Sequence, residues 1–287
     1  MSIEIKNLCH VYAPQTPFEY AALCDVSLSI PDGQYVAVIG HTGSGKSTLI
    51  QHLNGLMKPT SGSITVQGID LCAKKVPLRE LRRRVGLVFQ YPEYQLFEET
   101  VAKDVAFGPK NMGLDEQETD SRVREAISLV GLDESVLEMS PFDLSGGQKR
   151  RVAIAGVLSM RPEVLVLDEP IAGLDPLGRR DILALVAQYR EKTGATVILV
   201  SHNMDDVADI AQRVIVMNKG SVAMDGTPAE VFSQTERLKQ MGLDVPQVVL
   251  LGERLRQRGM DVPKDIITQQ QMLDFLLDKG VAGCSRT

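Results

Sequence analysis

The sequence has few cysteines, no surplus of basic residues and no long apolar run. Its cysteines are widely scattered and form no C-x-x-C pair, so we expect buried or inert thiols rather than a structural metal site or a disulfide framework. They are Cys9, Cys24, Cys72 and Cys284. The formal net charge of -6 argues against a broadly basic nucleic-acid surface, although residues 82–84 and 149–151 are local basic runs. Nucleic acid is therefore not an expected partner.

No stretch approaches the roughly 18 apolar residues that a membrane-spanning helix needs. The first residues, MSIE, lack the basic start and apolar core of a signal peptide. We therefore expect a cytosolic chain. With 287 residues and 44% hydrophobic content, it can bury one large core, or one core and a smaller appendage.

Residues 35–57 join a β-rich apolar run to a glycine-rich turn and then to an amphipathic helix. Within them, GHTGSGKST fits the pattern G-x-x-x-x-G-K-[ST], with Gly43 between the pattern's glycines Gly40 and Gly45. Glycines let the backbone turn its N–H groups toward an anion, because side chains there would block the approach. The pattern predicts a phosphate-binding loop.

The residues after these glycines extend the prediction to a nucleotide. The helix start adds a positive dipole end, Lys46 can reach the β- and γ-phosphates, and the Ser47 hydroxyl can hold Mg²⁺. A glycine turn with a conventional helix cap would explain the glycines but not the Lys-Ser-Thr sequence after a β-strand. We therefore predict an ATP or GTP site. Its loop residues are Gly40, His41, Thr42, Gly43, Ser44, Gly45, Lys46, Ser47 and Thr48.

Apolar patterns indicate an α/β fold with a β-rich N-terminal part. The expected strands cover residues 3–8, 26–30, 63–67, 85–89, 164–167, 196–200 and 214–217. Helical stretches at 176–192 and 203–211 separate the later strands, which is typical of a parallel sheet. Between about 99 and 160 the apolar spacing becomes helical, which predicts an inserted helical subdomain.

Beyond Gly226 the pattern is helical again, with expected helices at 228–240, 246–258 and 269–278. We therefore expect a first domain over residues 1–226. Residues 227–287 would form a small C-terminal helical extension, for which dimerisation is one role to consider.

A phosphate loop needs a second Mg²⁺-directed carboxylate at the end of a buried strand. Residues 164–169, VLVLDE, offer two acids at such a strand end. Asp168 would hold Mg²⁺ directly or through water, and Glu169 would activate a water as a general base. Two acids closing an apolar strand could also be a capped, solvated strand end, but the upstream phosphate loop favours the catalytic interpretation.

A second anion site is predicted where a Ser-Gly-Gly sequence precedes the helical run 149–159. Ser145 can cap this helix and leave backbone amides free at its N-terminus. The alternative is a flexible linker before an ordinary helix. The residues of this motif are Leu144, Ser145, Gly146, Gly147 and Gln148.

In combination, these motifs resemble the ATP-binding subunits of ABC transporters. GHTGSGKST is similar to their Walker A motif, LSGGQ matches their signature motif, and VLVLDEP is similar to their Walker B motif. The resemblance covers about residues 1–230 and implies a P-loop NTPase core of the ABC ATPase type, with ATP and Mg²⁺ as cofactors. Ile171 departs from the family, which commonly has Thr there, and we expect this to affect only local packing.

The resemblance assigns four more residues. It implies that Tyr12 stacks on adenine, that Gln90 is the Q-loop residue and a Mg²⁺ ligand, that Asp175 lies in the D-loop, and that His202 is the switch histidine. Each has a structural alternative. Tyr12 could be a core or turn aromatic, Gln90 could be an ordinary polar strand end, and a lone histidine at a strand end is more often a hydrogen-bonded structural residue.

Within the family, residues 89–100 and 105–111 resemble the ATPases of energy-coupling factor transporters, the second of their two paired types, or a cobalt-importer ATPase. Such importers take up vitamins or Co²⁺ and Ni²⁺ through a substrate-binding membrane subunit and a transmembrane scaffold subunit. The resemblance thus implies a peripheral protein at the cytoplasmic face of the cell membrane. It also implies a head-to-tail dimer with a second ATPase subunit, identical or different, in which residues 145–148 contact ATP held by the other subunit.

Four apolar side chains follow Gln90, where the resemblance places the groove that receives a short helix of the scaffold. They are Tyr91, Tyr94, Leu96 and Phe97. An aromatic-rich loop is costly to leave in water, so we expect an interface anchor here. The alternative is that these side chains pack inward against the helical subdomain.

The expected function is an ATP hydrolase coupled to transmembrane transport. A soluble ABC-type ATPase acting on DNA or the ribosome is the alternative, but such relatives carry long coiled-coil arms or duplicated ATPase domains. This chain has one phosphate loop and no sustained heptads. A module that senses nucleotide without hydrolysis is a third interpretation, against which Glu169 and His202 both argue.

Overall fold

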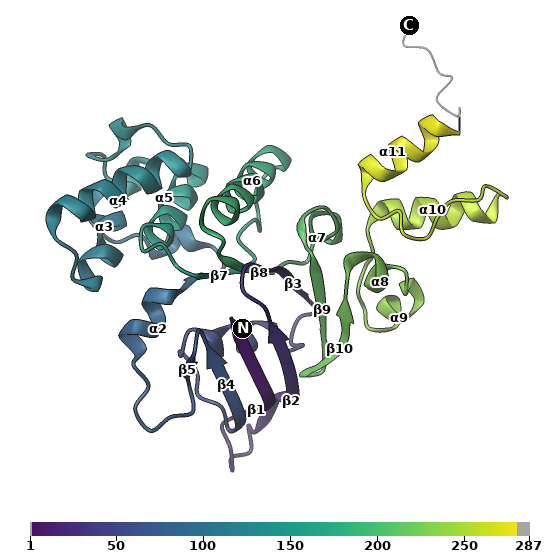
Figure 1. The fold of residues 1–287 in the computed structure, drawn as a ribbon, viewed down its shortest axis with the longest axis horizontal. Coiled ribbons are helices and arrows are strands. Elements are labelled where there is room, and N and C mark those ends of the chain that lie inside the picture. Colours follow the sequence, from purple (N-terminus) through teal and green to yellow (C-terminus); the bar gives the residue numbers. More distant parts are fainter. Residues whose placement is uncertain (1, 280–287) are drawn as a thin grey trace, which may run out of the picture.

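The computed structural model describes residues 2–279, which form two β-sheets with helices around them (Figure 1). The strands are β1 (Ile3–Tyr12), β2 (Tyr20–Ile30), β3 (Tyr35–Ile39), β4 (Ser61–Val66), β5 (Ile69–Asp70), β6 (Val85–Val88), β7 (Val164–Asp168), β8 (Thr196–Val200), β9 (Arg213–Asn218) and β10 (Ser221–Gly226).

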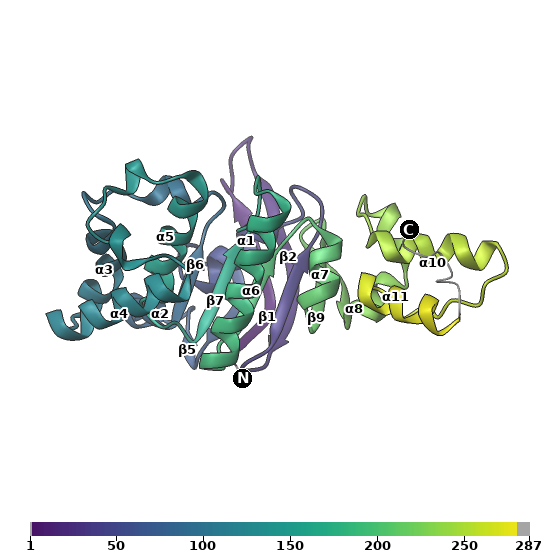
Figure 2. The same cartoon turned by 90° about the horizontal axis from the view of Figure 1, so that it is seen from above.

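Helices follow or connect most of these strands, and α3 to α5 and α8 to α11 form two longer helical stretches. The α-helices are α1 (Lys46–Leu53), α2 (Leu78–Arg84), α3 (Val101–Met112), α4 (Glu116–Leu129), α5 (Gly146–Leu158), α6 (Pro176–Thr193), α7 (Met204–Ile210), α8 (Pro228–Phe232), α9 (Thr235–Gln240), α10 (Gln247–Gln257) and α11 (Gln269–Asp278). Short 3₁₀ helices are η1 (Pro92–Gln95), η2 (Glu134–Val136) and η3 (Pro141–Asp143). Both views place α3 to α5 at one end of the molecule and α10 and α11 at the other (Figures 1 and 2).

The larger sheet has the strand order β10-β9-β3-β8-β7-β6. Its strands are parallel except for β10, which runs antiparallel to β9. Every residue of β3, β7 and β8 is buried, as expected for parallel strands covered on both faces. The phosphate loop follows β3, which lies between β8 and β9, so it has a rigid base.

The smaller sheet, of order β2-β1-β4-β5, is antiparallel. Its buried side chains, among them Ile3, Ile5 and Ile64, pack with Val36 and Val38 of β3 in one apolar core. A second core lies on the other side of the larger sheet and includes the buried faces of α3, α4 and α5. Val123, Ala126, Ile127 and Val130 share this core, as their helical spacing predicts.

The C-terminal helices pack on the larger sheet through a third core that includes Phe232, Leu238 and Ile39. The single helix expected over 228–240 is wrong, because α8 and α9 are separate. Residues 232 and 238 would lie about 120° apart around one continuous helix. The break lets both side chains enter the same core, where each is fully buried.

The three cysteines among residues 2–279 are free thiols, and none of them is fully buried. Cys9 is half-buried, whereas Cys24 and Cys72 are exposed. Of the expected buried or inert thiols, burial is wrong for these two residues, because Cys24 is an outward-facing residue of β2 and Cys72 follows the short edge strand β5. Cys284 lies outside the described residues.

Candidate functional site

The phosphate loop connects β3 to α1 and needs glycine at two positions for steric reasons. Gly45, at the N-cap of α1, has a left-handed φ of 102°, and a Cβ there would lie 2.6 Å from the Ala22 carbonyl oxygen. A Cβ at Gly40 would lie 2.4 Å from the Met217 carbonyl oxygen. Both distances are shorter than those at which real Cβ atoms approach backbone atoms. The packed backbone at Ala22 and Met217 therefore requires glycine at these two positions.

The Lys46 side chain hydrogen-bonds to the backbone at the start of the phosphate loop. Its Nζ donates to the carbonyl oxygens of Gly40 and His41 at 2.7 and 3.1 Å. Burial lowers the pKa of Lys46, while the Glu169 and Asp168 carboxylates oppose that shift. A phosphate group entering the loop would replace the two carbonyl oxygens as partners of this ammonium.

Other loop side chains also have defined surroundings. His41 contacts the Thr42 carbonyl oxygen through Nδ1 at 2.7 Å and the Asn218 side-chain oxygen through Nε2 at 3.2 Å. The buried Ser44 hydroxyl has no hydrogen-bond partner among the described residues. This hydroxyl lies against Gly40, since a Cβ added there would be 2.5 Å from Ser44 Oγ.

Asp168 lies at the end of β7 and is almost fully buried. The pKa of this carboxyl is raised overall, mainly because the group is buried, while a hydrogen bond from the Ser47 hydroxyl opposes the shift. The structure thus brings two of the three residues predicted to hold Mg²⁺, Ser47 and Asp168, into contact. Hydroxyl, carboxylate and amide oxygens are the donor set that Mg²⁺ prefers, and a nucleotide's phosphates complete such a site.

Three residues predicted to act in catalysis meet because they follow neighbouring parallel strands. Gln90 follows β6, Glu169 follows β7 and His202 follows β8, and these strands are adjacent in the sheet. His202 Nε2 lies 2.7 Å from Glu169 Oε1, and Gln90 Nε2 donates to Glu169 Oε2 at 3.2 Å. Glu169 has a left-handed φ of 49°, which is rare outside glycine and is typical of strained functional positions.

The second predicted anion site is the N-terminus of α5. The Ser145 hydroxyl accepts from the Gln148 amide, and the Gln148 side chain accepts from the Ser145 amide, which makes a capping box. A Cβ added at Gly146 or Gly147 would meet nothing within 4 Å. Leu144 is buried in the core of α3 to α5 and anchors this turn. The first turn of α5 is therefore fixed and open.

Two further predicted residues have clear local contacts. The Tyr12 hydroxyl lies 3.1 Å from the Thr48 hydroxyl and 3.3 Å from Met57 Sδ, so the ring lies beside α1. The Asp175 carboxylate accepts from the Gly178 amide at 2.7 Å and caps α6. Tyr12 is thus in contact with the phosphate loop, whereas the contact of Asp175 is with the start of α6.

Comparison with known proteins identifies the family. The family model described as "ABC transporter" matches residues 23–172. The chain is 57% identical over 279 residues to the energy-coupling factor transporter ATP-binding protein EcfA2 of Clostridium perfringens, which covers 97% of this chain and 98% of that protein. The chain belongs to the energy-coupling factor group of ABC transporter ATPases. A relative of the same name from Clostridium tetani is 58% identical over 252 residues, 88% of each chain.

Solved structures agree with this membership. CbiO1 of Clostridium perfringens, part of the ABC transporter complex cbiONQ, has a TM-score of 0.74 at 40% identity and covers 88% of this chain and 98% of its own. The ATP-binding cassette MJ0796, solved as a dimer bound to ADP and Pi, has a TM-score of 0.71 at 29% identity, with 79% and 98% covered.

The comparisons confirm the ABC resemblance, the P-loop ATPase fold and the function of an ATP-binding and ATP-hydrolysing transporter subunit. They do not favour the alternative of a soluble ATPase acting on nucleic acid or the ribosome. No helix within residues 2–279 is both long and apolar enough to cross a bilayer.

One polar cluster of this ABC ATPase was missed from the sequence. Arg150 belongs to the basic run 149–151, yet it is only 3% exposed and forms an ion pair with Glu93. The run 149–151 therefore does not form a continuous basic patch, because Arg150 is buried. Sequence reasoning had no signal for it, because Glu93 and Arg150 are 57 residues apart along the chain.

Proposed function

We propose that this ATPase powers an importer of the energy-coupling factor type, with the residues around Glu169 as its hydrolytic centre. The observation that carries the proposal is the convergence of Gln90 and His202 on the Glu169 carboxylate at the end of a buried strand. The neighbouring Ser47 and Asp168 supply oxygen ligands for Mg²⁺ beside the phosphate loop.

Each residue then has a distinct task. Bound Mg²⁺ would neutralise phosphate charge, and Ser47, Asp168 and Gln90 would hold it. Lys46 would bind the terminal phosphates, and Glu169 would accept a proton from the attacking water. His202, which contacts Glu169 at 2.7 Å, would orient that carboxylate. Tyr12, Asp175 and the loop residues Gly40, His41, Thr42, Gly43, Ser44, Gly45 and Thr48 would complete the nucleotide contacts.

A second ATPase subunit would complete each site. Within residues 2–279, no hydrogen bond joins the first turn of α5 to the phosphate loop, and α5 and α1 lie in different parts of the fold (Figure 2). The open Gly146 and Gly147 are suited to receive a phosphate group from another chain. The dimeric cassette MJ0796 supports such an assembly.

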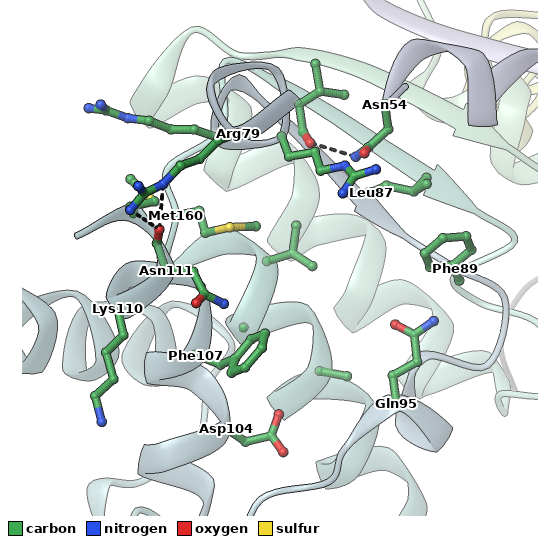
Figure 3. A pocket seen from close by; sticks show the side chains of 18 of the residues that line it. Asn54, Arg79, Leu87, Phe89, Gln95, Asp104, Phe107, Lys110, Asn111 and Met160 are labelled. Carbon is green, nitrogen blue, oxygen red and sulfur yellow. Dashed lines mark hydrogen bonds between the residues drawn. The ribbon is translucent and has the colours of Figure 1, made fainter. Parts of the chain in front are cut away.

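A pocket near Gln90 is suited to a membrane partner. Its volume is about 920 Å³, and it opens between α2, α3, α5 and the segment around η1 (Figure 3). Phe89, Phe107 and Met160 contribute apolar surface, and Arg79 and Lys110 add positive charge. We propose that a short helix of the transmembrane scaffold subunit docks here.

The structure changes which residues could form that interface. Leu96, expected as an interface anchor, also lines the pocket, but it is only 7% exposed and packs in the core of α3 to α5. Tyr91 and Tyr94 are exposed but do not line the pocket, whereas Phe97 is exposed and lines it. The Asp104 carboxylate accepts from the Phe97 amide at 2.9 Å and fixes this segment. The interface is therefore proposed around Phe97 and Phe107.

The proposed cargo is a vitamin or a transition-metal ion, Co²⁺ or Ni²⁺, delivered by a substrate-binding membrane subunit. The ATPase would act from the cytoplasmic face of the membrane, bound to the scaffold subunit. Purification of the tagged chain from its own membranes, with identification of bound proteins and ATP-dependent uptake by the reconstituted complex, tests the proposal. Recovery of the chain without any membrane protein, despite active ATP hydrolysis, would reject it.

A further inference from the structure

The side chain of Arg150 joins three segments of the site. Arg150 lies in the second turn of α5, and its Nε and Nη2 donate to the Glu93 carboxylate at 2.9 and 2.6 Å. Its Nη1 donates to the carbonyl oxygens of Pro170 and Ala172 at 3.3 and 2.7 Å. One guanidinium thus holds η1 and the backbone that follows Glu169 to the same helix.

These contacts form a closed ring of which the proposed base, Glu169, is a member. Glu93 follows Gln90 closely in the chain, and Pro170 follows Glu169 directly. The ring is completed by the hydrogen bond from Gln90 to Glu169. A displacement of Arg150 would therefore change the position of Glu169 from two sides.

Two physical features make this connection stiff. A guanidinium and a carboxylate that share two parallel hydrogen bonds have a fixed relative geometry, and separating them here would leave a buried charge unpaired. Burial, the largest influence, would raise the pKa of Glu93, but the hydrogen bonds and charge of Arg150, together with a hydrogen bond from the Glu93 backbone, lower that pKa overall. Glu93 therefore stays ionised and paired at neutral pH.

Neighbouring backbone is strained in the same place. Tyr91, whose ring centroid lies 5.8 Å from the Arg150 guanidinium, has a left-handed φ of 53°. Glu169 has a similar φ of 49°. Such conformations persist only where the surroundings hold them. Arg150 faces the ring of Tyr91 and donates to the carbonyl oxygen of Pro170, the residue after Glu169.

We propose that Arg150 is a positioning residue for ATP hydrolysis. It fixes the segment after Glu169 against the segment after Gln90, so that movements of α5 reach the base. This inference rests on the proposed role of Glu169 and adds a residue outside the three motifs.

The test uses the full chain in the purified transporter complex, with kcat, KM for ATP, ATP binding and thermal unfolding measured separately. Arg150→Gln, Glu93→Gln and the double variant are compared. The double variant leaves no unpaired buried charge, so it guards against simple misfolding. We expect each to lower kcat by about tenfold to a hundredfold with ATP affinity changed by less than about threefold, because small displacements of catalytic groups are costly.

The expected signature is non-additivity: the double variant should lose no more than the worse single variant, because both changes break one ring. Arg150→Lys should recover only part of the activity, since an ammonium cannot reproduce the planar fork. The matched control is Arg151→Gln, because Arg151 lies next to Arg150 on α5. This change removes an ion pair with Asp181 of α6 and should leave kcat within about twofold of wild type.

Two results would overturn the inference. One is a wild-type kcat in the folded double variant, and the other is an equal loss of kcat in Arg151→Gln. Glu169→Gln is measured alongside. Full activity in that variant would reject the proposed base and the inference with it, whereas a defect in Glu169→Gln without any in the Arg150 variants would reject the inference alone.

Discussion

At the scale of single residues, Glu169 is constrained both by its side-chain partners and by its backbone conformation. Both of its carboxylate oxygens have partners, His202 on one side and Gln90 on the other. Its backbone is left-handed, which costs about 1–3 kcal/mol for a residue with a side chain. To accept a proton from water, the carboxylate must exchange one of these partners, so its neighbours control when it can act.

Glu169→Gln should lower ATP turnover by about 10²–10⁴ while ATP binding is retained, because an amide cannot act as the base. Turnover and nucleotide binding are measured separately in the assembled complex. Lys46→Ala is the contrasting variant, since its removal should weaken ATP binding instead. A wild-type rate in Glu169→Gln would show that another group is the base.

At the scale of elements, the residues that cap the first turn of α5 differ from those that leave space for a ligand. The capping box occupies the amides of Ser145 and Gln148, while Gly146 and Gly147 between them have no neighbour where a Cβ would lie. The folded chain itself therefore does not require glycine at these two positions. A requirement for glycine there would come from something that binds against the turn.

Gly147→Ala should consequently separate stability from activity. Within the chain the added methyl group meets no atom within 4 Å, and alanine favours a helix over glycine by up to about 1 kcal/mol. We expect the unfolding temperature to stay constant or rise, while hydrolysis in the assembled dimer falls at least about tenfold. Thermal unfolding and kcat decide the matter, and unchanged hydrolysis would mean that no nucleotide approaches this turn.

At the scale of the whole molecule, the two helix N-termini that could bind one triphosphate lie in separate parts of the fold. Helix α1 follows the central strand β3, whereas α5 packs with α3 and α4 at one end of the molecule (Figure 1). A head-to-tail dimer would join them across two chains. ATP would then hold the dimer together, and hydrolysis would release it, as in a ligand-driven two-state switch.

Mixed dimers test this arrangement. One subunit carries Ser145→Arg, which places bulk and charge at the open turn, and the other carries Lys46→Ala. If the turn acts in trans, both changes fall on one composite site and the other site keeps its nucleotide binding. Counting bound nucleotides per dimer gives the answer, and loss of both sites would indicate action in cis.

The proposed membrane interface makes a prediction at the same scale. Phe97 and Phe107 are exposed, and their rings contact each other edge to face with centroids 5.1 Å apart beside the pocket. Phe97→Asp or Phe107→Asp should abolish recovery of the membrane complex and leave folding and ATP binding intact, because a buried unpaired charge opposes docking.

Leu251→Asp, at an exposed apolar position on α10 away from the pocket, is the matched control and should leave the complex intact. Circular dichroism and nucleotide binding check the fold of each variant. An intact, transporting complex with both phenylalanines replaced would place the interface elsewhere.

The sequence by itself determined the local chemistry of this protein. The glycine spacing of the phosphate loop, the cap at Ser145 and the acids ending β7 depend on neighbours within a few residues, and each is found where the pattern predicts it. Strand positions were also readable, since buried parallel strands form short β-branched runs; β8 occupies the predicted residues, and β7 extends one residue further.

Only the tertiary structure decided which distant residues meet. The contacts of Gln90 and His202 with Glu169 follow from the order β6, β7, β8 in the sheet, and no local pattern encodes that order. For the same reason the sequence could not show that Leu96 faces inward or that Arg150 is buried against Glu93. Local patterns fix backbone conformation, whereas these pairings depend on how elements far apart in the chain pack together.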